Sequence, residues 1–142
     1  MKNICSKIFL FLIVIFIISF EKEYKVVNTG VEGSWELRSA TSMISSTYPP
    51  GNGRIISFTG NKYEMKENGQ IIRSGEFKVE EDLTAGESTC LNKTPGKYTS
   101  RVIYDNNVSA AKTFLDLSEN KLIIISGCFA ADAGVSLEYE RQ

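Results

Sequence analysis

From residue 31 onward, apolar and polar residues alternate in short runs that are separated by Gly, Asn, Asp and Pro. A period of two is typical of β-strands with one buried face, whereas an amphipathic helix repeats about every 3.6 residues. The alternation predicts about eight short strands, at residues 34–38, 55–59, 62–67, 70–79, 98–104, 112–117, 121–126 and 135–140.

Two tight turns predict the register of the central strands. The first, Gly60-Asn61, has Gly in the first turn position, as a type II′ hairpin requires. Pairing outward from this turn places Phe58 opposite Tyr63 and Ile56 opposite Met65. All four side chains then lie on one apolar face.

The second turn, Asn68-Gly69, has the composition of a type I′ hairpin. Pairing outward from it places Met65 opposite Ile72 and Glu64 opposite Arg73. We therefore expect Met65 and Ile72 on the apolar face and the charged pair on the face exposed to water.

Irregular segments interrupt the alternation. A bulge is expected at residues 74–75, where the parity of the apolar positions shifts and Gly tolerates unusual backbone angles. A helical turn is expected within residues 40–46, and long polar loops are expected at 80–97 and 127–134. Consecutive hairpins with few long connections then favour an all-β fold, a single eight-stranded antiparallel up-and-down barrel whose closure removes free strand edges.

The first twenty residues differ from the rest of the chain. Lys2 and Lys7 accompany an unbroken apolar run over residues 8–18, and no acidic residue occurs before Glu21. The run is shorter than the roughly 20 residues that span a bilayer, but it is typical of a signal peptide. We expect residues 1–20 to form a helical signal peptide or an uncleaved anchor.

The end of this segment resembles a bacterial lipoprotein signal, in which acidic residues follow an acylated Cys. Phe20 occupies the position of that Cys, which leaves two alternatives: a cleaved, soluble protein or one held by an uncleaved tether. In both cases we expect export to the periplasm, cell envelope or extracellular space, with membrane contact only through the N-terminal segment. Residues 21–30 would be a linker and 31–142 the single folded domain.

Composition removes several classes of function. The chain has no His, which excludes His-dependent catalysis and His-ligated metal sites. Its formal net charge is −1, and it becomes −3 when residues 1–20 are removed with their two lysines. Electrostatic binding of nucleic acid is therefore not expected. We expect no enzymatic activity, no cofactor and no metal.

Two cysteines remain after residue 20, Cys90 and Cys128. An even pair in an oxidising compartment is typical of a disulfide bond. The alternatives are two inert buried thiols or a reactive pair, although the chain has no CxxC motif and no His to activate a thiol.

Short motifs follow one another along the strand pattern. They are Gly33-Ser34-Trp35-Glu36-Leu37, Ile56-x-Phe58, Tyr63-x-Met65, Asn68-Gly69, Gly75-x-Phe77 and Leu137-x-Tyr139-x-Arg141. Together they resemble the lipocalin-like domains of exported Bacteroidetes proteins, which are barrels of the calycin type. The resemblance covers residues 31–142 and implies an eight-stranded barrel with a small interior cavity. It also implies that Trp35 and Leu37 plug the base, with Arg141 packed across Trp35.

The predicted interior face points to ligand binding. Its apolar and aromatic residues would line a cavity: Ile56, Phe58, Tyr63, Met65, Ile72, Phe77, Tyr98, Val102, Tyr104, Leu115 and Ile124. We expect a monomeric barrel that reversibly binds a small hydrophobic ligand. The alternative is an envelope or cell-surface module with a solid core, which binds a protein or glycan through its loops. A cavity of roughly a few hundred Å³ would favour the first.

Overall fold

The alternating segments form strands in a computed structural model, which describes residues 30–91 and 96–142. The strands are β1 (Gly33–Thr41), β2 (Ser45–Thr47), β3 (Ile55–Thr59), β4 (Lys62–Glu67), β5 (Gln70–Glu81), β6 (Ser100–Tyr104), β7 (Thr113–Leu117), β8 (Lys121–Ser126) and β9 (Val135–Arg141). Two short helices in the described connections are α2 (Ala85–Thr89) and η1 (Phe129–Ala131). The expected signal or anchor segment, residues 1–20, lies outside the described residues, as does all but the last residue of the expected linker.

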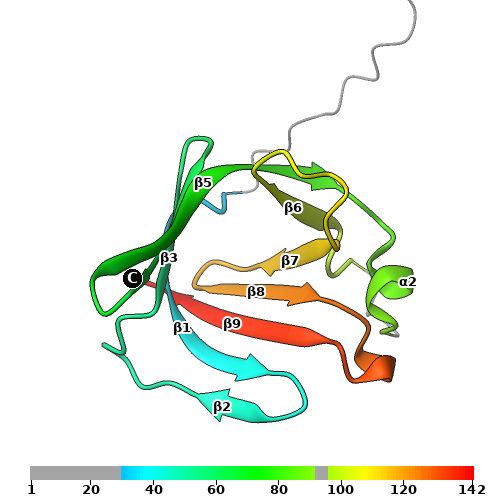
Figure 1. Cartoon of the computed structure of the whole chain (residues 1–142), viewed down its shortest axis with the longest axis horizontal. Helices are drawn as coiled ribbons and strands as arrows, with labels where there is room; N and C mark the ends of the chain where they lie inside the picture. Colours follow the sequence, from blue (N-terminus) through cyan, green and yellow to red (C-terminus); the bar gives the residue numbers. More distant parts are fainter. Residues whose placement is uncertain (1–29, 92–95) are drawn as a thin grey trace, which may run out of the picture.

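Eight of these strands close into a barrel (Figure 1). Each strand pairs with the next in the order β1, β3, β4, β5, β6, β7, β8, β9, and β9 pairs back with β1. Every pairing is antiparallel. The all-β, antiparallel, up-and-down barrel predicted from the sequence is therefore confirmed, and its closure gives each of the eight strands a partner on both sides.

The additional strand, β2, replaces the helical turn that we expected within residues 40–46. β1 continues to Thr41, and β2 pairs with its last three residues, from Ser39 opposite Thr47 to Thr41 opposite Ser45. The helical-turn prediction was wrong because Ser and Thr are weak helix formers, and β-branched Thr fits an extended chain.

The register predicted from Gly60-Asn61 is confirmed. Phe58 lies opposite Tyr63 and Ile56 lies opposite Met65. A two-residue turn fixes the pairing of the residues on either side of it, so the composition of this turn was sufficient to predict the register.

The register predicted from Asn68-Gly69 holds for only two residue pairs. Both turn residues have positive φ, as a type I′ turn requires, and Lys66 lies opposite Ile71. The register then shifts, so that Met65 lies opposite Arg73 rather than Ile72. Ile72 is the extra residue of a bulge and its side chain is 63% exposed. The alternation could not reveal this, because two adjacent isoleucines fit either parity.

The bulge moves Arg73 to the face on which Met65 lies, so the predicted outward pairing of Glu64 with Arg73 was wrong. The bulge expected at residues 74–75 was also wrong, because the parity shift occurs at Ile72. Gly75 has a different role: a Cβ there would overlap the carboxylate of Asp105 and crowd the ring of Tyr63.

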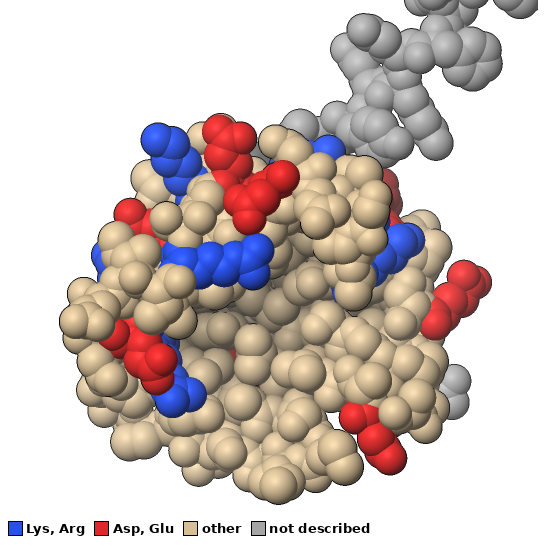
Figure 2. Space-filling model, viewed as in Figure 1, with Lys and Arg blue, Asp and Glu red and all other residues tan. Residues whose placement is uncertain are grey.

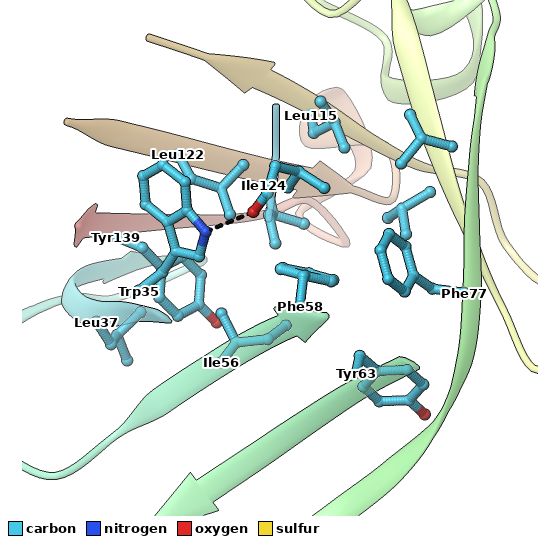
Figure 3. Close-up of a cluster of buried hydrophobic side chains, with 13 residues drawn as sticks. Trp35, Leu37, Ile56, Phe58, Tyr63, Phe77, Leu115, Leu122, Ile124 and Tyr139 are labelled. Carbon is cyan, nitrogen blue, oxygen red and sulfur yellow. Dashed lines mark hydrogen bonds between the residues drawn. The ribbon is translucent and has the colours of Figure 1, made fainter. Parts of the chain in front are cut away.

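Side chains from all eight barrel strands fill much of the interior (Figure 3). The Phe58 and Phe77 rings meet edge to face, with centroids 4.7 Å apart, and Tyr63 meets Tyr104 in the same way. These contacts bury the apolar face that the alternation predicted. The core residues are Val31, Trp35, Leu37, Ile56, Phe58, Tyr63, Phe77, Val79, Val102, Leu115, Leu122, Ile124 and Tyr139.

A second apolar cluster lies outside the barrel wall. Phe114 and Ile125 are buried there against Ala85 of α2, with Leu91, Tyr98, Ile123 and Phe129 packed around them. The segment between β5 and β6 therefore covers the outer face of β7 and β8. The unbroken apolar run over residues 122–125 indicates that this strand is buried on both faces, because such a strand shows no alternation.

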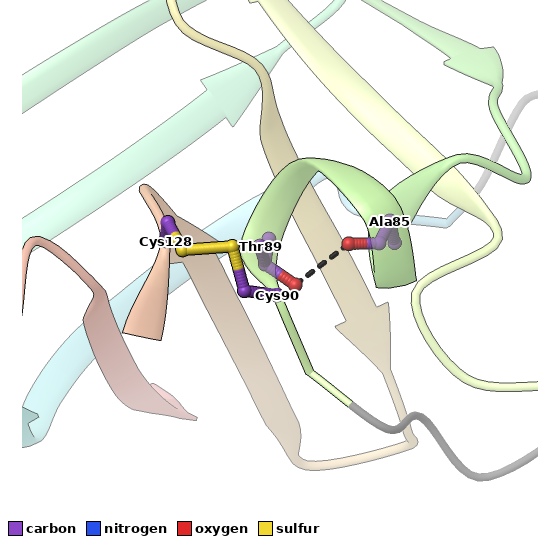
Figure 4. The surroundings of a disulfide bond; sticks show 4 residues. All are labelled: Ala85, Thr89, Cys90 and Cys128. Carbon is purple, nitrogen blue, oxygen red and sulfur yellow. Dashed lines mark hydrogen bonds between the residues drawn. A yellow bond between two sulfur atoms is a disulfide. The ribbon is translucent and has the colours of Figure 1, made fainter. Parts of the chain in front are cut away.

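The predicted disulfide between Cys90 and Cys128 is present (Figure 4). It joins the end of α2 to the connection between β8 and β9 and closes a separation of 38 residues. The helix that carries Cys90 is also held by a bond from the Thr89 hydroxyl to the Ala85 carbonyl, 2.6 Å long. The segment that covers the outer cluster is thus fixed at its end.

Candidate functional site

The base of the barrel is closed around Trp35. This side chain is fully buried, and its indole Nε1 donates to the Val31 carbonyl at 2.8 Å. The Arg141 guanidinium lies over the indole ring, 4.1 Å from its centroid. Leu37, two residues further along β1, is also buried. The polar group of this indole is therefore satisfied, and its ring is packed beneath a cation.

Arg141 also holds the chain that leads into β1. Its guanidinium donates to the Glu32 carbonyl at 2.9 Å, to the Gly30 carbonyl at 3.3 Å and to the Glu119 carbonyl at 3.1 Å. Gly33 makes room for it, since a Cβ there would lie 2.8 Å from an Arg141 nitrogen, and its φ of 127° suits only Gly. One side chain therefore ties two segments to the base, the chain before β1 and the turn between β7 and β8.

The opposite end of the barrel is open and contains a cavity. Figure 2, viewed as Figure 1, shows the molecule hollowed near the centre of this face, with mostly uncharged side chains around the hollow. The cavity has a volume of about 160 Å³. Its lining residues come from β1, β4, β9, the starts of β3 and β5 and the residue before β3: Leu37, Arg54, Ile55, Ile56, Met65, Lys66, Glu67, Ile72 and Tyr139. It is smaller than the few hundred Å³ typical of pockets for drug-sized molecules.

The predicted ligand-lining residues are distributed over three places. Ile56, Met65 and Ile72 line the cavity, Ile72 from an exposed position at the rim. Tyr63 and Tyr104 pack against each other inside the barrel. The remaining interior members belong to the packed core and do not line the cavity: Phe58, Phe77, Val102, Leu115 and Ile124.

Tyr98 lies in none of these places, so its predicted position on the inner face of a strand was wrong. β6 begins only at Ser100, and Tyr98 has a positive φ of 54°. Its ring packs against the cluster outside the barrel. The prediction failed because it began this strand at Tyr98, two residues before β6 begins at Ser100.

Tyr139 is one of the wall residues that the predicted ligand-lining set lacked; the others are Leu37, which was expected only to plug the base, and Arg54, Ile55, Lys66 and Glu67. Its side chain is only 8% exposed, and its hydroxyl has no hydrogen-bond partner among the described residues. In Figure 3 the ring lies beside Trp35, and the oxygen is on the side of Ile56. Burial raises the pKa of Tyr139 to about 12, so the phenol keeps its proton at neutral pH. Apolar and polar residues alternate over residues 135–140, and this alternation predicts that Tyr139 points inward.

A polar cluster lies beside the two packed tyrosines. The Tyr63 hydroxyl donates to Asp105 at 3.1 Å, and the backbone N–H of Glu76 donates to the same carboxylate at 3.2 Å. Arg73 donates to Asp105 at 3.3 Å, and its guanidinium lies 5.6 Å from the ring centroids of Tyr63 and Tyr104. These donors hold the pKa of Asp105 below its usual value despite the opposing effect of desolvation.

The cations around the cavity and this cluster are paired with acids. Arg54 contacts Glu67 at 2.8 Å, and Lys66 contacts Glu64 at 3.0 Å. Arg73 is paired with Asp105 as described above. The mouth of the barrel therefore has charged side chains but little net charge to offer a ligand.

A second hollow, of about 270 Å³, lies between β6 and the segment that leads into β7. It arises because β7 pairs with β6 only as far as Thr113 opposite Val102, so Ile103 and Tyr104 have no partner on β7. Its charged lining residues are Arg73, Arg101, Asp105 and Lys112. Arg101 is bound to Glu80 at 2.6 Å, and Lys112 is bound to Asp82 at 2.9 Å.

The loop over residues 48–53 is fixed beside the open end by a buried carboxylate. Glu36 is only 2% exposed and accepts bonds from Arg38 at 2.6 Å, Gly51 N–H at 3.1 Å and Gly53 N–H at 3.2 Å. These bonds, the one from Arg38 foremost, lower the pKa of Glu36 to about 2 against the opposing effect of desolvation. Glu36 alternates with the inward-facing Trp35 and Leu37 on β1, and the loop that folds over it explains its burial.

Comparisons with family models, curated proteins and solved structures found no match to this chain. The closed, antiparallel, eight-stranded barrel is consistent with a calycin or lipocalin-like fold. No helix within residues 30–91 and 96–142 is long and apolar enough to cross a membrane. The same residues include no group of three or more Cys, Asp or Glu side chains placed to hold a metal ion.

Proposed function

We propose that this protein is an exported barrel that reversibly binds a small, largely apolar molecule at its open end. The observation that carries the proposal is the cavity of about 160 Å³, which Leu37, Ile56, Met65 and Tyr139 line below the rim. Apolar walls supply affinity by burying ligand surface, at about 25 cal/mol per Å². No covalent step is involved, and the protein is expected to act as a monomer.

The volume limits the buried part of the ligand. An apolar protein cavity of about 150 Å³ accommodates benzene, so a single six-membered ring or a short branched alkyl group fits a cavity of about 160 Å³. A longer molecule would bury one end and leave the other outside the mouth. Flat polycyclic ligands require a larger interior than this packed core provides.

The disulfide supports the proposed location. Bonds such as Cys90–Cys128 form and persist in oxidising compartments, which include the periplasm and the extracellular space. We propose export of the chain to one of these compartments or to the cell envelope, directed by residues 1–20.

Titration of the isotope-labelled full chain with toluene, followed by backbone amide chemical shifts, tests the proposal. We expect saturable shifts around residues 54–56 and 65–67. Met65→Phe places a larger side chain in the cavity wall and should weaken binding about tenfold or more. Met43→Phe is the matched control, because Met43 is 79% exposed, and this variant should bind as the wild type does.

Toluene shifts that are absent, or that are the same in Met65→Phe as in the wild type, would overturn the proposal. Unfolding curves of both variants separate loss of the cavity from loss of the fold. A variant that retains a cooperative transition has kept its core.

A second function is favoured by a separate observation at the same end. Large aliphatic side chains are exposed on two connections and one strand start there: Met43 and Ile44 between β1 and β2, Val108 between β6 and β7, and Ile71 and Ile72 near the start of β5. Exposed apolar patches are typical of interaction surfaces. The alternative is thus an envelope or cell-surface module that binds a protein or glycan. Met43→Ser with Ile44→Ser should abolish capture of such a partner and leave toluene binding unchanged.

A further inference from the structure

We infer that the ligand of the open-end cavity is an uncharged molecule whose polar group is a single acceptor oxygen, such as a ketone carbonyl, bound by the Tyr139 hydroxyl. The inference rests on the proposed function and specifies the ligand class of the same cavity. Its basis is the juxtaposition of the Tyr139 phenol, which is buried in the cavity wall without a partner among the described residues, with a mouth whose cations are already paired.

The Tyr139 hydroxyl has an unused hydrogen-bond donor. A buried hydroxyl without a partner costs free energy, and most buried polar groups in proteins are satisfied. Tyr139 is 8% exposed and lines the cavity together with Ile56 and Met65. A ligand oxygen in this cavity would provide the missing acceptor, and the apolar walls would surround the rest of the ligand.

The charges around the site argue against an anionic ligand. Arg54, Lys66 and Arg73 are paired with Glu67, Glu64 and Asp105. A carboxylate that entered the cavity would lose its water and would have to compete with these acids for a counter-charge. An uncharged carbonyl loses much less solvation free energy on the same transfer.

The charges argue equally against a cationic ligand. Glu64, Glu67 and Asp105 are each already in contact with a cation, and Tyr139 stays protonated. The wall residues Leu37, Ile56 and Met65 bring no further charge. The cavity therefore disfavours both anionic and cationic ligands. The Tyr139 hydroxyl is the polar group that it offers below the rim.

Three probes of similar ring size separate the possibilities: cyclohexanone, toluene and cyclohexanecarboxylate. Each is titrated into the full chain as wild type, Tyr139→Phe and Tyr98→Phe. Tyr98→Phe removes the same atom from the cluster outside the barrel and is the matched control.

We expect Tyr139→Phe to weaken cyclohexanone about three- to tenfold, the effect of one neutral hydrogen bond. Toluene should bind equally well or slightly better in this variant, and Tyr98→Phe should bind all three probes as the wild type does. Cyclohexanecarboxylate should bind the wild type at least about tenfold more weakly than cyclohexanone does.

Two results would overturn the inference while the proposed function stands: toluene binds but cyclohexanone affinity is the same in Tyr139→Phe, or the carboxylate binds as tightly as the ketone. If toluene and cyclohexanone both fail to bind a folded wild type, the proposed function fails as well. Folding is checked in each variant by its cooperative unfolding curve.

Discussion

The two ends of the barrel are built from different kinds of interaction. At the base, Trp35 is fully buried, its N–H is bonded to Val31, and Arg141 lies over its ring. At the open end, a cavity of about 160 Å³ remains, and the Tyr139 hydroxyl beside it has no partner in the described part of the chain. Trp35 thus has no exposed surface and a satisfied N–H, whereas Tyr139 borders unfilled volume and has a hydroxyl that no described residue satisfies.

This difference indicates where stability and function are located. A closed barrel needs one well-packed layer to hold its strands together, and the base provides it. Unfilled volume and an unsatisfied hydroxyl both cost stability, so their presence at one end is typical of a binding site rather than of a core. The predictions below test this division, from the largest expected effect to the smallest.

Trp35→Ala should have the largest effect on stability. Removing a fully buried aromatic side chain costs about 3–5 kcal/mol, because transfer and cavity contributions add. Met65→Ala at the open end should cost less than about 2 kcal/mol, because Met65 is only partly buried beside an existing cavity. Urea denaturation of the full chain measures both. Equal losses would contradict the division between a stabilising base and a binding end.

Cys90→Ser combined with Cys128→Ser should have the next largest effect. A loop closed over a separation of 38 residues stabilises by about 2–4 kcal/mol in the chain-entropy account. The bond fixes the end of the segment that covers the outer cluster, and neither Cys lines the cavity. Denaturation should therefore show the loss while toluene binding is unchanged. Loss of toluene binding in a folded double variant would show that the outer cluster supports the cavity.

The sequence predicted the closed fold and one register well, and local features account for this success. The Gly60-Asn61 turn determines its own pairing, so Phe58 opposite Tyr63 followed from the composition of the turn. The disulfide followed from the even number of cysteines after residue 20 and from the expectation that the chain is exported. Each of these inferences needed only neighbouring residues or a count.

The site was harder to predict because it depends on distant residues. The bulge at Ile72 moved Arg73 to the inner face, where it meets Asp105. Adjacent isoleucines fit either parity, so the alternation could not predict this arrangement. Burial of Glu36 under the 48–53 loop likewise depends on how a loop folds back, and strand periodicity contains no information about that.

Glu36→Gln should cost about 1–3 kcal/mol at neutral pH, because it removes a charge that accepts bonds from Arg38, Gly51 and Gly53. The folded pKa of about 2 is below the ordinary 4.5, so this stabilisation is fully present above about pH 4.5. It is lost as the pH falls through about 2. The difference between wild type and variant should therefore shrink over that window in denaturation curves at several pH values. A constant difference down to pH 2 would contradict the assignment to Glu36.

The smallest expected effects on stability are those of two tyrosine substitutions. Tyr63→Phe removes a hydroxyl that donates to Asp105 and should cost about 1–2 kcal/mol. Tyr139→Phe removes a hydroxyl without a partner in the described structure, so stability should stay within about 0.5 kcal/mol of the wild type or rise slightly. Thermal unfolding without ligand measures both variants. A loss in Tyr139→Phe as large as that in Tyr63→Phe would mean that the Tyr139 hydroxyl stabilises the empty barrel. In that case the hydroxyl would not depend on a ligand for its hydrogen-bond partner. Tyr139 would then no longer distinguish the open end from the base.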